Sequence, residues 1–349
     1  MDKNAAVLGA GGFIGSWMSK YLMEKGYNVT GVDIKEHEWM ENSEFCNEFH
    51  KLDLRNMDNV MQAIKGNDEV YQFAADMGGI GFIMTKHADV ISNSVTINKN
   101  VVEACRIYDI DKIFFSSSAC IYPEYLQDED FEKLSGSYIL KESDAFPADP
   151  DSFYGFEKLF SELLYWAYHL DYNLNIRIAR YHNVQGMMTT WQEPRCKAPA
   201  ALCRKIAELS PEGGEIEVWG DGHQVRTFLN INDCCEATYR LMNCPDDKYY
   251  ALGEIGKPRP PAVNIGSDEE IMINELVSMI SEIAGKEVKI RYDLSKPQGV
   301  RSRSADLTIV KDLLDWEPKY SLRDTMEELY PWVESEIKKH TSAQIKCSK

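Results

Sequence analysis

Tyr154 and Lys158 stand four positions apart in this 349-residue sequence, a spacing that places both side chains on one face of a helix. The lysine charge would favour the phenolate form of the tyrosine by direct electrostatics. A tyrosine prepared in this way can accept a hydroxyl proton while hydride leaves the same carbon. The spacing is common by chance, so its meaning depends on where the pair lies in the fold.

A second group of reactive side chains lies in residues 116–123, which read SSSACIYP. A serine beside the tyrosine can hydrogen-bond the same substrate hydroxyl; Ser118 is the candidate, with Ser117 as the alternative. Cys120 follows directly. A single cysteine is usually an inert buried thiol, but this one follows a predicted strand, and an open parallel sheet builds its site at the carboxyl ends of its strands.

A glycine-rich loop lies near the start of the chain, where Gly9, Gly12 and Gly15 recur between an apolar run and a helical pattern. Glycines let the backbone approach a pyrophosphate closely, and the N–H groups of the following helix then face the phosphate. Asp33 ends the next apolar run, where a carboxylate would bind the adenosine ribose and repel a 2′-phosphate, so NAD is predicted rather than NADP. Four more residues complete the predicted cofactor site: Phe13 and Ile14 begin the helix, and Asp53 and Leu54 would flank the adenine.

A sheet must hold these groups at one edge, and the chain contains the pattern for it. Apolar runs alternate with helical patterns, which predicts a Rossmann-type α/β fold, a doubly wound parallel sheet with helices on both faces. The expected strands are residues 5–9, 28–33, 49–54, 70–75, 112–117 and 174–181, and the expected helices are 13–25, 84–107 (one or two helices) and 154–170.

The rhythm changes after about residue 183. Helices are expected at 199–209, 232–242, 274–284, 307–314 and 322–338, strands at 216–219 and 262–265, and a Pro/Gly-rich loop at 253–261. We therefore expect an NAD-binding domain at 1–183. A smaller C-terminal α/β lobe at 184–340 would mainly bind substrate, with some segments returning to the first domain.

The composition argues against several classes of partner. The formal net charge of −18 repels nucleic acid and anionic membranes, and no apolar stretch approaches the roughly 20 residues of a membrane helix. The nine cysteines include no Cys-x-x-Cys pair and no Cys/His cluster with zinc-ligand spacing. We expect a cytoplasmic protein with reduced thiols, no metal, and a local positive pocket for any phosphate-bearing ligand.

Longer segments resemble the GDP-mannose 3,5-epimerase family, a branch of the extended short-chain dehydrogenases, from about residue 5 to about residue 338. The resemblance is carried by AADMGGIGF at 74–82, SSACIYPE at 117–124, KESDA at 141–145, WGDG at 219–222 and VNIGSDE at 263–269. The cysteine after the serines and KAPA at 197–200 are more specific than the general short-chain dehydrogenase pattern.

The resemblance implies a role for each of four residues. Tyr154 and Lys158 would drive oxidation of a nucleotide-linked sugar at carbon 4 by NAD, and Cys120 and Lys197 would act as an acid/base pair. A ketone at carbon 4 makes the protons on carbons 3 and 5 acidic, and inversion needs a base and an acid on opposite faces of the ring. Lys197 would need a pKa lowered by burial or by a positive neighbour. Which of the two removes each proton stays open.

The same resemblance implies further contacts. Arg226 and Arg301 would clasp the pyrophosphate with bidentate guanidinium groups, and Asn183 would touch a phosphate or the sugar. The other implied residues are Ala74 and Ala75 at the cofactor, and Gly78, Gly79 and Ala198 at the sugar. Family members commonly dimerise through helices like those at 84–107 and 154–170, so a homodimer is expected.

The chain departs from the family pattern at three places. Gln185 stands where an aromatic residue is common, residues 191–196 replace a glycine-richer approach to the lysine, and 243–261 is longer than expected. The first two lie near the expected sugar pocket and leave the sugar open. A related epimerase acting on a GDP-heptose derivative or a UDP-sugar, and a non-catalytic NAD-sensing protein, are the alternatives. Cys196 is a rival thiol to Cys120.

Overall fold

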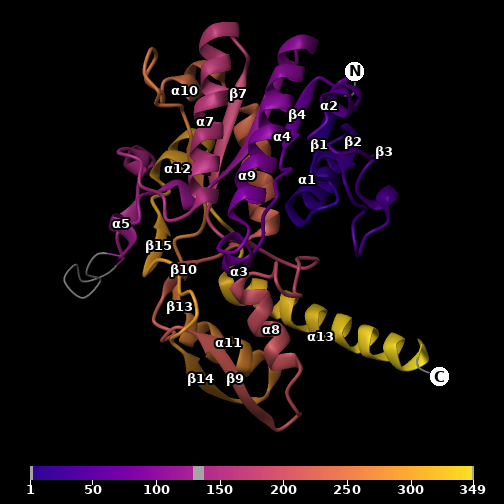
Figure 1. The fold of residues 1–349 in the computed structure, drawn as a ribbon, viewed down its shortest axis with the longest axis vertical. Coiled ribbons are helices and arrows are strands. Elements are labelled where there is room, and N and C mark those ends of the chain that lie inside the picture. The colour runs from indigo at the N-terminus through magenta and orange to yellow at the C-terminus, as the bar shows by residue number, and fades with distance from the viewer. Residues whose placement is uncertain (1–2, 129–136, 348–349) are drawn as a thin grey trace.

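A seven-stranded parallel sheet forms the centre of the computed structural model, which describes residues 3–128 and 137–347 (Figure 1). The strand order is β12-β7-β5-β4-β1-β2-β3. The strands are β1 (Asn4–Leu8), β2 (Asn28–Asp33), β3 (Glu48–Lys51), β4 (Glu69–Gln72), β5 (Lys112–Ser118), β7 (Ile176–Tyr181) and β12 (Val263–Ile265). The strand order reverses between β1 and β4, and sheets of this kind bind ligands in the crevice at that point. The predicted fold class is confirmed.

Helices cover both faces of the sheet. One core cluster joins the sheet to α1 (Phe13–Glu24), α9 (Ile231–Asn243) and α12 (Thr308–Leu314). The other joins it to α2 (Met57–Ile64), α4 (His87–Tyr108) and α7 (Phe153–Tyr172). Because the central strands are buried on both faces, they contain short runs of apolar residues, and these runs allowed the strands to be predicted. Strand β7 also buries two charged side chains, Arg177 and Arg180.

Several element boundaries differ from the predicted ones. The segment predicted as one or two helices at 84–107 is one helix, α4, and a short helix that was not predicted, α3 (Ile80–Ile83), precedes it. Helix α13 (Leu322–Cys347) is longer than expected. Helix α2 was not predicted, although Asn56 caps it by accepting a 2.8 Å hydrogen bond from the Asp58 N–H. The short elements that remain are η1 (Asn42–Glu44), η2 (Ala119–Ile121), α5 (Tyr125–Asp128), η3 (Glu142–Ala145), β8 (Val184–Gln185) and β11 (Leu229–Asn230).

The C-terminal part of the chain builds a smaller group of elements at the carboxyl ends of the central strands (Figure 1). Its core lies between α8 (Ala198–Ala207), α11 (Ile273–Ala284) and α13. Strands β9 (Gly213–Trp219) and β14 (Glu287–Asp293) pair in parallel, and a second small sheet has the order β13-β10-β15-β6. Its strands are β13 (Glu270–Met272), β10 (Val225–Thr227), β15 (Ser302–Ala305) and β6 (Ile139–Leu140). Strand β12 returns to the central sheet, while the domain boundary at residue 183 stays a prediction.

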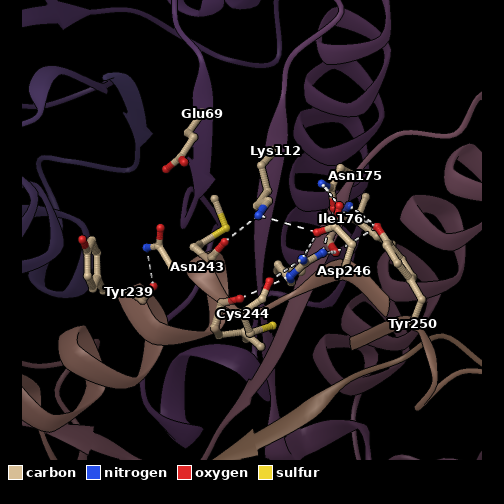
Figure 2. A network of polar contacts seen from close by, with 12 residues as sticks. Glu69, Lys112, Asn175, Ile176, Tyr239, Asn243, Cys244, Asp246 and Tyr250 are labelled. Carbon is tan, nitrogen blue, oxygen red and sulfur yellow. Dashed lines mark hydrogen bonds and ion pairs between the residues drawn. The ribbon is translucent and has the colours of Figure 1, made fainter. Parts of the chain in front are cut away.

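The long segment at 243–261 contains α10 (Asp246–Tyr250) and packs at the amino ends of β5 and β7. Figure 2 shows Lys112, Asn175, Asp246 and Tyr250 converging there. The buried Arg177 guanidinium forms an ion pair with Asp246, and Lys112 Nζ donates to the Met242 carbonyl at 2.8 Å. This end of the sheet lies opposite the carboxyl ends of its strands.

Two tyrosine hydroxyls complete the hydrogen bonding of β7 beside this segment. Strand β12 pairs with β7 only from Ala179 to Tyr181. Before that point, the N–H groups of Ile176 and Ile178 donate to the Tyr250 and Tyr249 hydroxyls, both at 2.8 Å. Segment 243–261 therefore covers the part of the β7 edge that β12 leaves unpaired.

Among residues 3–128 and 137–347, no helix is long and apolar enough to cross a membrane. In the same part of the chain, no group of three His, Cys, Asp or Glu side chains is arranged to hold a metal ion.

Candidate active site

A cavity of about 1200 Å³ opens at the carboxyl ends of the central strands and is lined from both parts of the chain. It brings together every predicted site residue except Arg301. The lining residues from the predicted cofactor site are Gly9, Gly12, Phe13, Ile14, Gly15, Asp33, Asp53, Leu54, Ala74 and Ala75. Those from the predicted catalytic and sugar sites are Gly78, Gly79, Ser118, Cys120, Tyr154, Lys158, Asn183, Lys197, Ala198 and Arg226.

The glycine loop forms a cradle that any side chain would fill. A Cβ on Gly9, which has a φ of +88°, would lie 2.7 Å from the Ala74 nitrogen, and a Cβ on Gly15 would lie 2.1 Å from the Gly9 carbonyl oxygen. Gly12 is the N-cap of α1 and offers no side-chain acceptor, so the N–H groups of the first turn are free for a phosphate. The loop therefore fits the pyrophosphate of a dinucleotide.

Asp33 is held at the end of β2 by the loop itself. Its carboxylate accepts the Gly11 N–H at 3.0 Å and the Lys35 N–H at 3.2 Å. Burial raises the pKa of Asp33, and these N–H groups oppose that effect. The carboxylate is thus fixed where a ribose would lie. The Asp53 carboxylate pairs instead with Arg55 at 2.7 Å, near the predicted adenine position.

The Tyr154–Lys158 pair occupies the start of α7. Lys158 Nζ donates to the Ser116 carbonyl at 2.9 Å and lies 5.8 Å from the centre of the Tyr154 ring. The two side chains are buried together, as the helical spacing predicted. Burial raises the pKa of Tyr154, so proton acceptance by its hydroxyl needs positive charge beside it. Lys158 is placed to supply it; burial lowers the pKa of Lys158, and the neighbouring Glu157 and Glu162 carboxylates oppose that effect.

Helix α7 is fixed against the strand end that carries Ser118 and Cys120. Ser152 caps the helix by accepting the Gly155 N–H at 3.2 Å. A Cβ on Gly155 would lie only 2.1 Å from the Cys120 carbonyl oxygen, so the helix start packs directly on that backbone. Ser118 Oγ accepts the Cys120 N–H at 3.2 Å. The tyrosine, serine and cysteine therefore face one region of the cavity.

Arg303 was not predicted as a site residue, yet its guanidinium contacts Cys120. Its Nη1 lies 3.1 Å from the cysteine sulfur, its Nη2 lies 3.1 Å from the Asp151 carboxylate, and its Nε donates to the Gln127 side chain. Arg303 lines the cavity and is 8% exposed. This contact places positive charge beside the cysteine sulfur, the atom that would react.

The prediction of Arg301 as a cavity residue needs correction. Its guanidinium pairs with both carboxylate oxygens of Asp221, at 2.9 and 3.0 Å, and it is not among the lining residues. The motif at 300–303 contains two arginines, Arg301 and Arg303, and the sequence alone does not show which of them enters the cavity. The pairing of β15 with β10 decides this, because it sets Arg303 beside Arg226.

Arg226 and Arg303 form a local positive site in an acidic molecule. Arg226 donates to the carbonyls of Val225 and Val300, at 2.8 and 2.7 Å. Burial and the neighbouring Arg303 hold the pKa of Arg226 well below its usual range. Two neighbouring guanidinium groups, of which Arg303 is buried and pairs with the Asp151 carboxylate, are suited to an anionic ligand.

Lys197 faces the cavity from the N-cap of α8. Desolvation lowers the pKa of Lys197, which is the direction that proton exchange near neutrality requires. In the described part of the chain, its ammonium group has no hydrogen bond or ion pair. Asn183 lies nearby with a φ of +51°, and its amide nitrogen donates to the Thr227 carbonyl at 3.1 Å.

Gln185 lines the same cavity and is fully buried. Neither its amide nitrogen nor its amide oxygen has a hydrogen-bond partner among the described residues. An unpaired buried amide costs on the order of 1–3 kcal/mol, so a partner within the cavity would offset this cost. The departure from an aromatic residue thus adds a polar group to the site.

The model of the NAD dependent epimerase/dehydratase family matches residues 5–266, three quarters of the chain. The chain belongs to the NAD-dependent epimerase/dehydratase family. It is therefore an NAD-dependent enzyme, and the glycine cradle and Asp33 fit that cofactor. The first 183 residues lie almost entirely within the matched region.

Individual relatives narrow the similarity within the NAD-dependent epimerase/dehydratase family. The chain is 40% identical over 340 residues to GDP-mannose 3,5-epimerase 1 of Oryza sativa subsp. japonica, covering 97% of this chain and 84% of that protein. It is 28% identical over 337 residues to GDP-L-fucose synthase 1 of Arabidopsis thaliana, covering 95% of this chain and 94% of that protein. The UDP-glucose 4-epimerase structure from Thermotoga maritima has a TM-score of 0.80 at 21% identity, covering 96% and 99%, and supports the fold alone.

Proposed function

We propose that this enzyme is a GDP-mannose 3,5-epimerase, which converts GDP-D-mannose to GDP-L-galactose and GDP-L-gulose. One observation carries the proposal: Cys120 and Lys197 line the same cavity as Tyr154 and Lys158. An enzyme that only transfers hydride at carbon 4 needs no such second pair. The 40% identity to plant GDP-mannose 3,5-epimerases over 96–97% of the chain supports the same substrate.

The first task of the site is to oxidise and later re-reduce carbon 4. Bound NAD supplies a reversible hydride acceptor. Tyr154 takes the proton of the carbon-4 hydroxyl at its phenolic oxygen, and Ser118 orients that hydroxyl. Lys158 holds positive charge beside the phenol and is itself anchored to the Ser116 carbonyl. The same proton returns to the sugar at the end of the cycle.

The second task is to move protons at carbons 3 and 5, which become acidic once carbon 4 is a ketone. Cys120 and Lys197 act from opposite sides of the ring, one as base and one as acid at each carbon. Arg303 places positive charge beside the Cys120 sulfur, and burial lowers the pKa of Lys197, which is the direction that proton exchange requires.

The nucleotide end of the substrate needs positive charge, which Arg226 and Arg303 supply. Asn183, Gly78, Gly79 and Ala198 would contact the phosphates or the sugar, because they line the same cavity as the arginines and the catalytic residues. Arg301 pairs with Asp221 and is not among the residues that line the cavity, so it is left out of this proposal.

Solvent deuterium exchange tests the function. The NAD-loaded enzyme is incubated with GDP-mannose in deuterium oxide, and the sugar protons are followed by NMR. Deuterium at carbons 3 and 5, with new GDP-hexose products, is the expected result. Exchange lost in Cys120→Ala or Lys197→Ala assigns the pair, and exchange at carbon 5 alone means a narrower epimerase. If no deuterium is taken up from GDP-mannose, GDP-mannose is not the substrate, and a GDP-heptose or a UDP-sugar is favoured. If no nucleotide sugar takes up deuterium, a non-catalytic NAD sensor is favoured.

We also propose a homodimer formed through α4 and α7. Three phenylalanines follow one another along α7 with their side chains in solvent: Phe153, Phe156 and Phe160 are 52%, 45% and 51% exposed. Apolar patches of this kind mark interaction surfaces. Sedimentation should give a dimer for the unmodified chain and a monomer for Phe156→Glu.

We propose a cytoplasmic location as well. The described cysteines are all free thiols, which supports a reducing compartment.

A further inference from the structure

The segment before Lys197 is fastened to a loop that follows β4. Arg195 Nη1 donates to the Met77 carbonyl at 2.6 Å, and Nη2 pairs with the Asp76 carboxylate at 3.0 Å. The same guanidinium stacks on the Phe82 ring, with its central carbon 3.8 Å from the ring centre. One side chain therefore makes three different contacts with residues 76–82.

The two backbones also touch. The Gly79 N–H donates to the Arg195 carbonyl at 3.0 Å. A Cβ on Gly79 would lie 2.1 Å from the Cys196 carbonyl oxygen, and a Cβ on Gly78 would lie 3.1 Å from Arg195 Cγ. Glycine at both positions is therefore what lets the segment lie so close to the loop.

The position of Lys197 depends on this contact. In the described chain its ammonium group has no partner, so the backbone that carries it must place it. That backbone is held at Arg195 on one side and continues into α8 on the other, where the Ala201 N–H donates to the Lys197 carbonyl at 3.0 Å. We propose that Arg195 is the positioning residue for Lys197, clasping residues 76–82 so that the lysine stands over the substrate ring. This role rests on the proposed epimerase function.

The clasp should matter for one half of the chemistry only. Tyr154 and Lys158 stand on α7, and Cys120 follows β5 beside Arg303, so residues 191–197 do not hold them. The loop side of the clasp does touch Tyr154, whose hydroxyl lies 3.9 Å from the Met77 sulfur, but Arg195 binds the Met77 carbonyl and not that side chain. Loss of the clasp should displace Lys197 while the oxidation at carbon 4 continues. A displacement of about 1 Å can cost on the order of 100-fold in a catalysed step.

The test compares Arg195→Ala with Lys197→Ala, Cys120→Ala and a matched control. The control is Arg259→Ala, because Arg259 also lies over a phenylalanine ring, 5.6 Å from the centre of Phe146, and pairs with Glu254 outside the cavity. Two quantities are measured with GDP-mannose: formation of reduced nicotinamide, by its absorbance, and deuterium uptake at each sugar carbon, by NMR.

The expected result is that Arg195→Ala keeps nicotinamide reduction within about twofold but loses at least about tenfold in deuterium uptake. The fall in deuterium uptake at each carbon should match the pattern measured for Lys197→Ala and not the pattern measured for Cys120→Ala. Arg259→Ala should match the unmodified enzyme. Arg195→Lys, which keeps the charge but cannot hold both acceptors, should fall between and serves if the alanine variant does not fold.

Three results would overturn the role. Deuterium uptake in Arg195→Ala equal to that of the unmodified enzyme would show that the lysine needs no clasp. A parallel loss of nicotinamide reduction, or a pattern that follows Cys120→Ala, would show general damage to the site. No uptake by the unmodified enzyme would remove the proposed function, and this role with it.

Discussion

Replacing Arg303 by methionine should weaken binding of the nucleoside diphosphate, whereas the same change at Arg301 should not. Methionine is similar in length but carries no charge. Arg303 lines the cavity beside Arg226, while Arg301 pairs with Asp221 outside it. A hydrogen bond to a charged group contributes about 1.5–3 kcal/mol, which corresponds to roughly 10- to 150-fold in affinity. Arg301 is partly exposed, and exposed pairs contribute about 0–1 kcal/mol.

Titration calorimetry with GDP measures this effect without the sugar chemistry. The expected loss of affinity is at least about tenfold for Arg303→Met and no more than about threefold for Arg301→Met. At saturating GDP-mannose, Arg303→Met should also slow the deuterium uptake that depends on Cys120, because the sulfur loses its cationic neighbour. Equal affinities in Arg303→Met and the unmodified enzyme, or a greater loss in Arg301→Met, would refute the assignment of the two arginines.

Three other substitutions test separate parts of the structure. Lys197→Met should raise the melting temperature near neutral pH, because burial lowers the pKa of this lysine from 10.5 and so disfavours its charged form in the folded state. The gain should disappear as the pH rises past 10.5, and a gain that persists there would contradict the sign of the shift. Gln185→Met should stabilise the ligand-free protein by up to about 2 kcal/mol in urea titration, since it removes an unpaired amide; destabilisation would mean that the amide already has a partner. Tyr249→Phe removes the hydroxyl that joins the Ile178 N–H to the Pro261 carbonyl and should lower the free energy of unfolding by about 1–3 kcal/mol. Deuterium uptake into the sugar, per folded molecule, should be unchanged. A changed uptake would show that segment 243–261 is coupled to the active site.

The parts of the fold that sequence could predict are those with local causes. The buried strands of the central sheet read as apolar runs because both faces are covered, and the glycine loop reads as a motif because its backbone allows no side chain. Strands β10, β13 and β15 were missed, since three or four residues in a small sheet carry little periodicity. Their partners lie far away in the chain, and only the pairing makes them strands.

The site divides in the same way. Tyr154 and Lys158 are joined by helix geometry, so their contact could be predicted from spacing. The choice between Arg301 and Arg303 depends on the β10–β15 register, and the clasp of Arg195 depends on a loop more than a hundred residues earlier. Such contacts are set by tertiary structure, and no local pattern encodes them. Gln185 was noticed as a departure, but its missing partners could not be known before its burial was.

The net charge of −18 gave one expectation that the folded chain explains physically: a phosphate-bearing ligand would need a local positive pocket. Arg226 and Arg303 are adjacent in register, and only Arg303 has a carboxylate, at Asp151. Burial and the charge of Arg303 work against the charged form of Arg226, which lowers its pKa. A diphosphate bound between the two guanidinium groups would offset that repulsion and favour the charged form of Arg226. An acidic surface around such a pocket would also disfavour long polyanions relative to a small nucleotide.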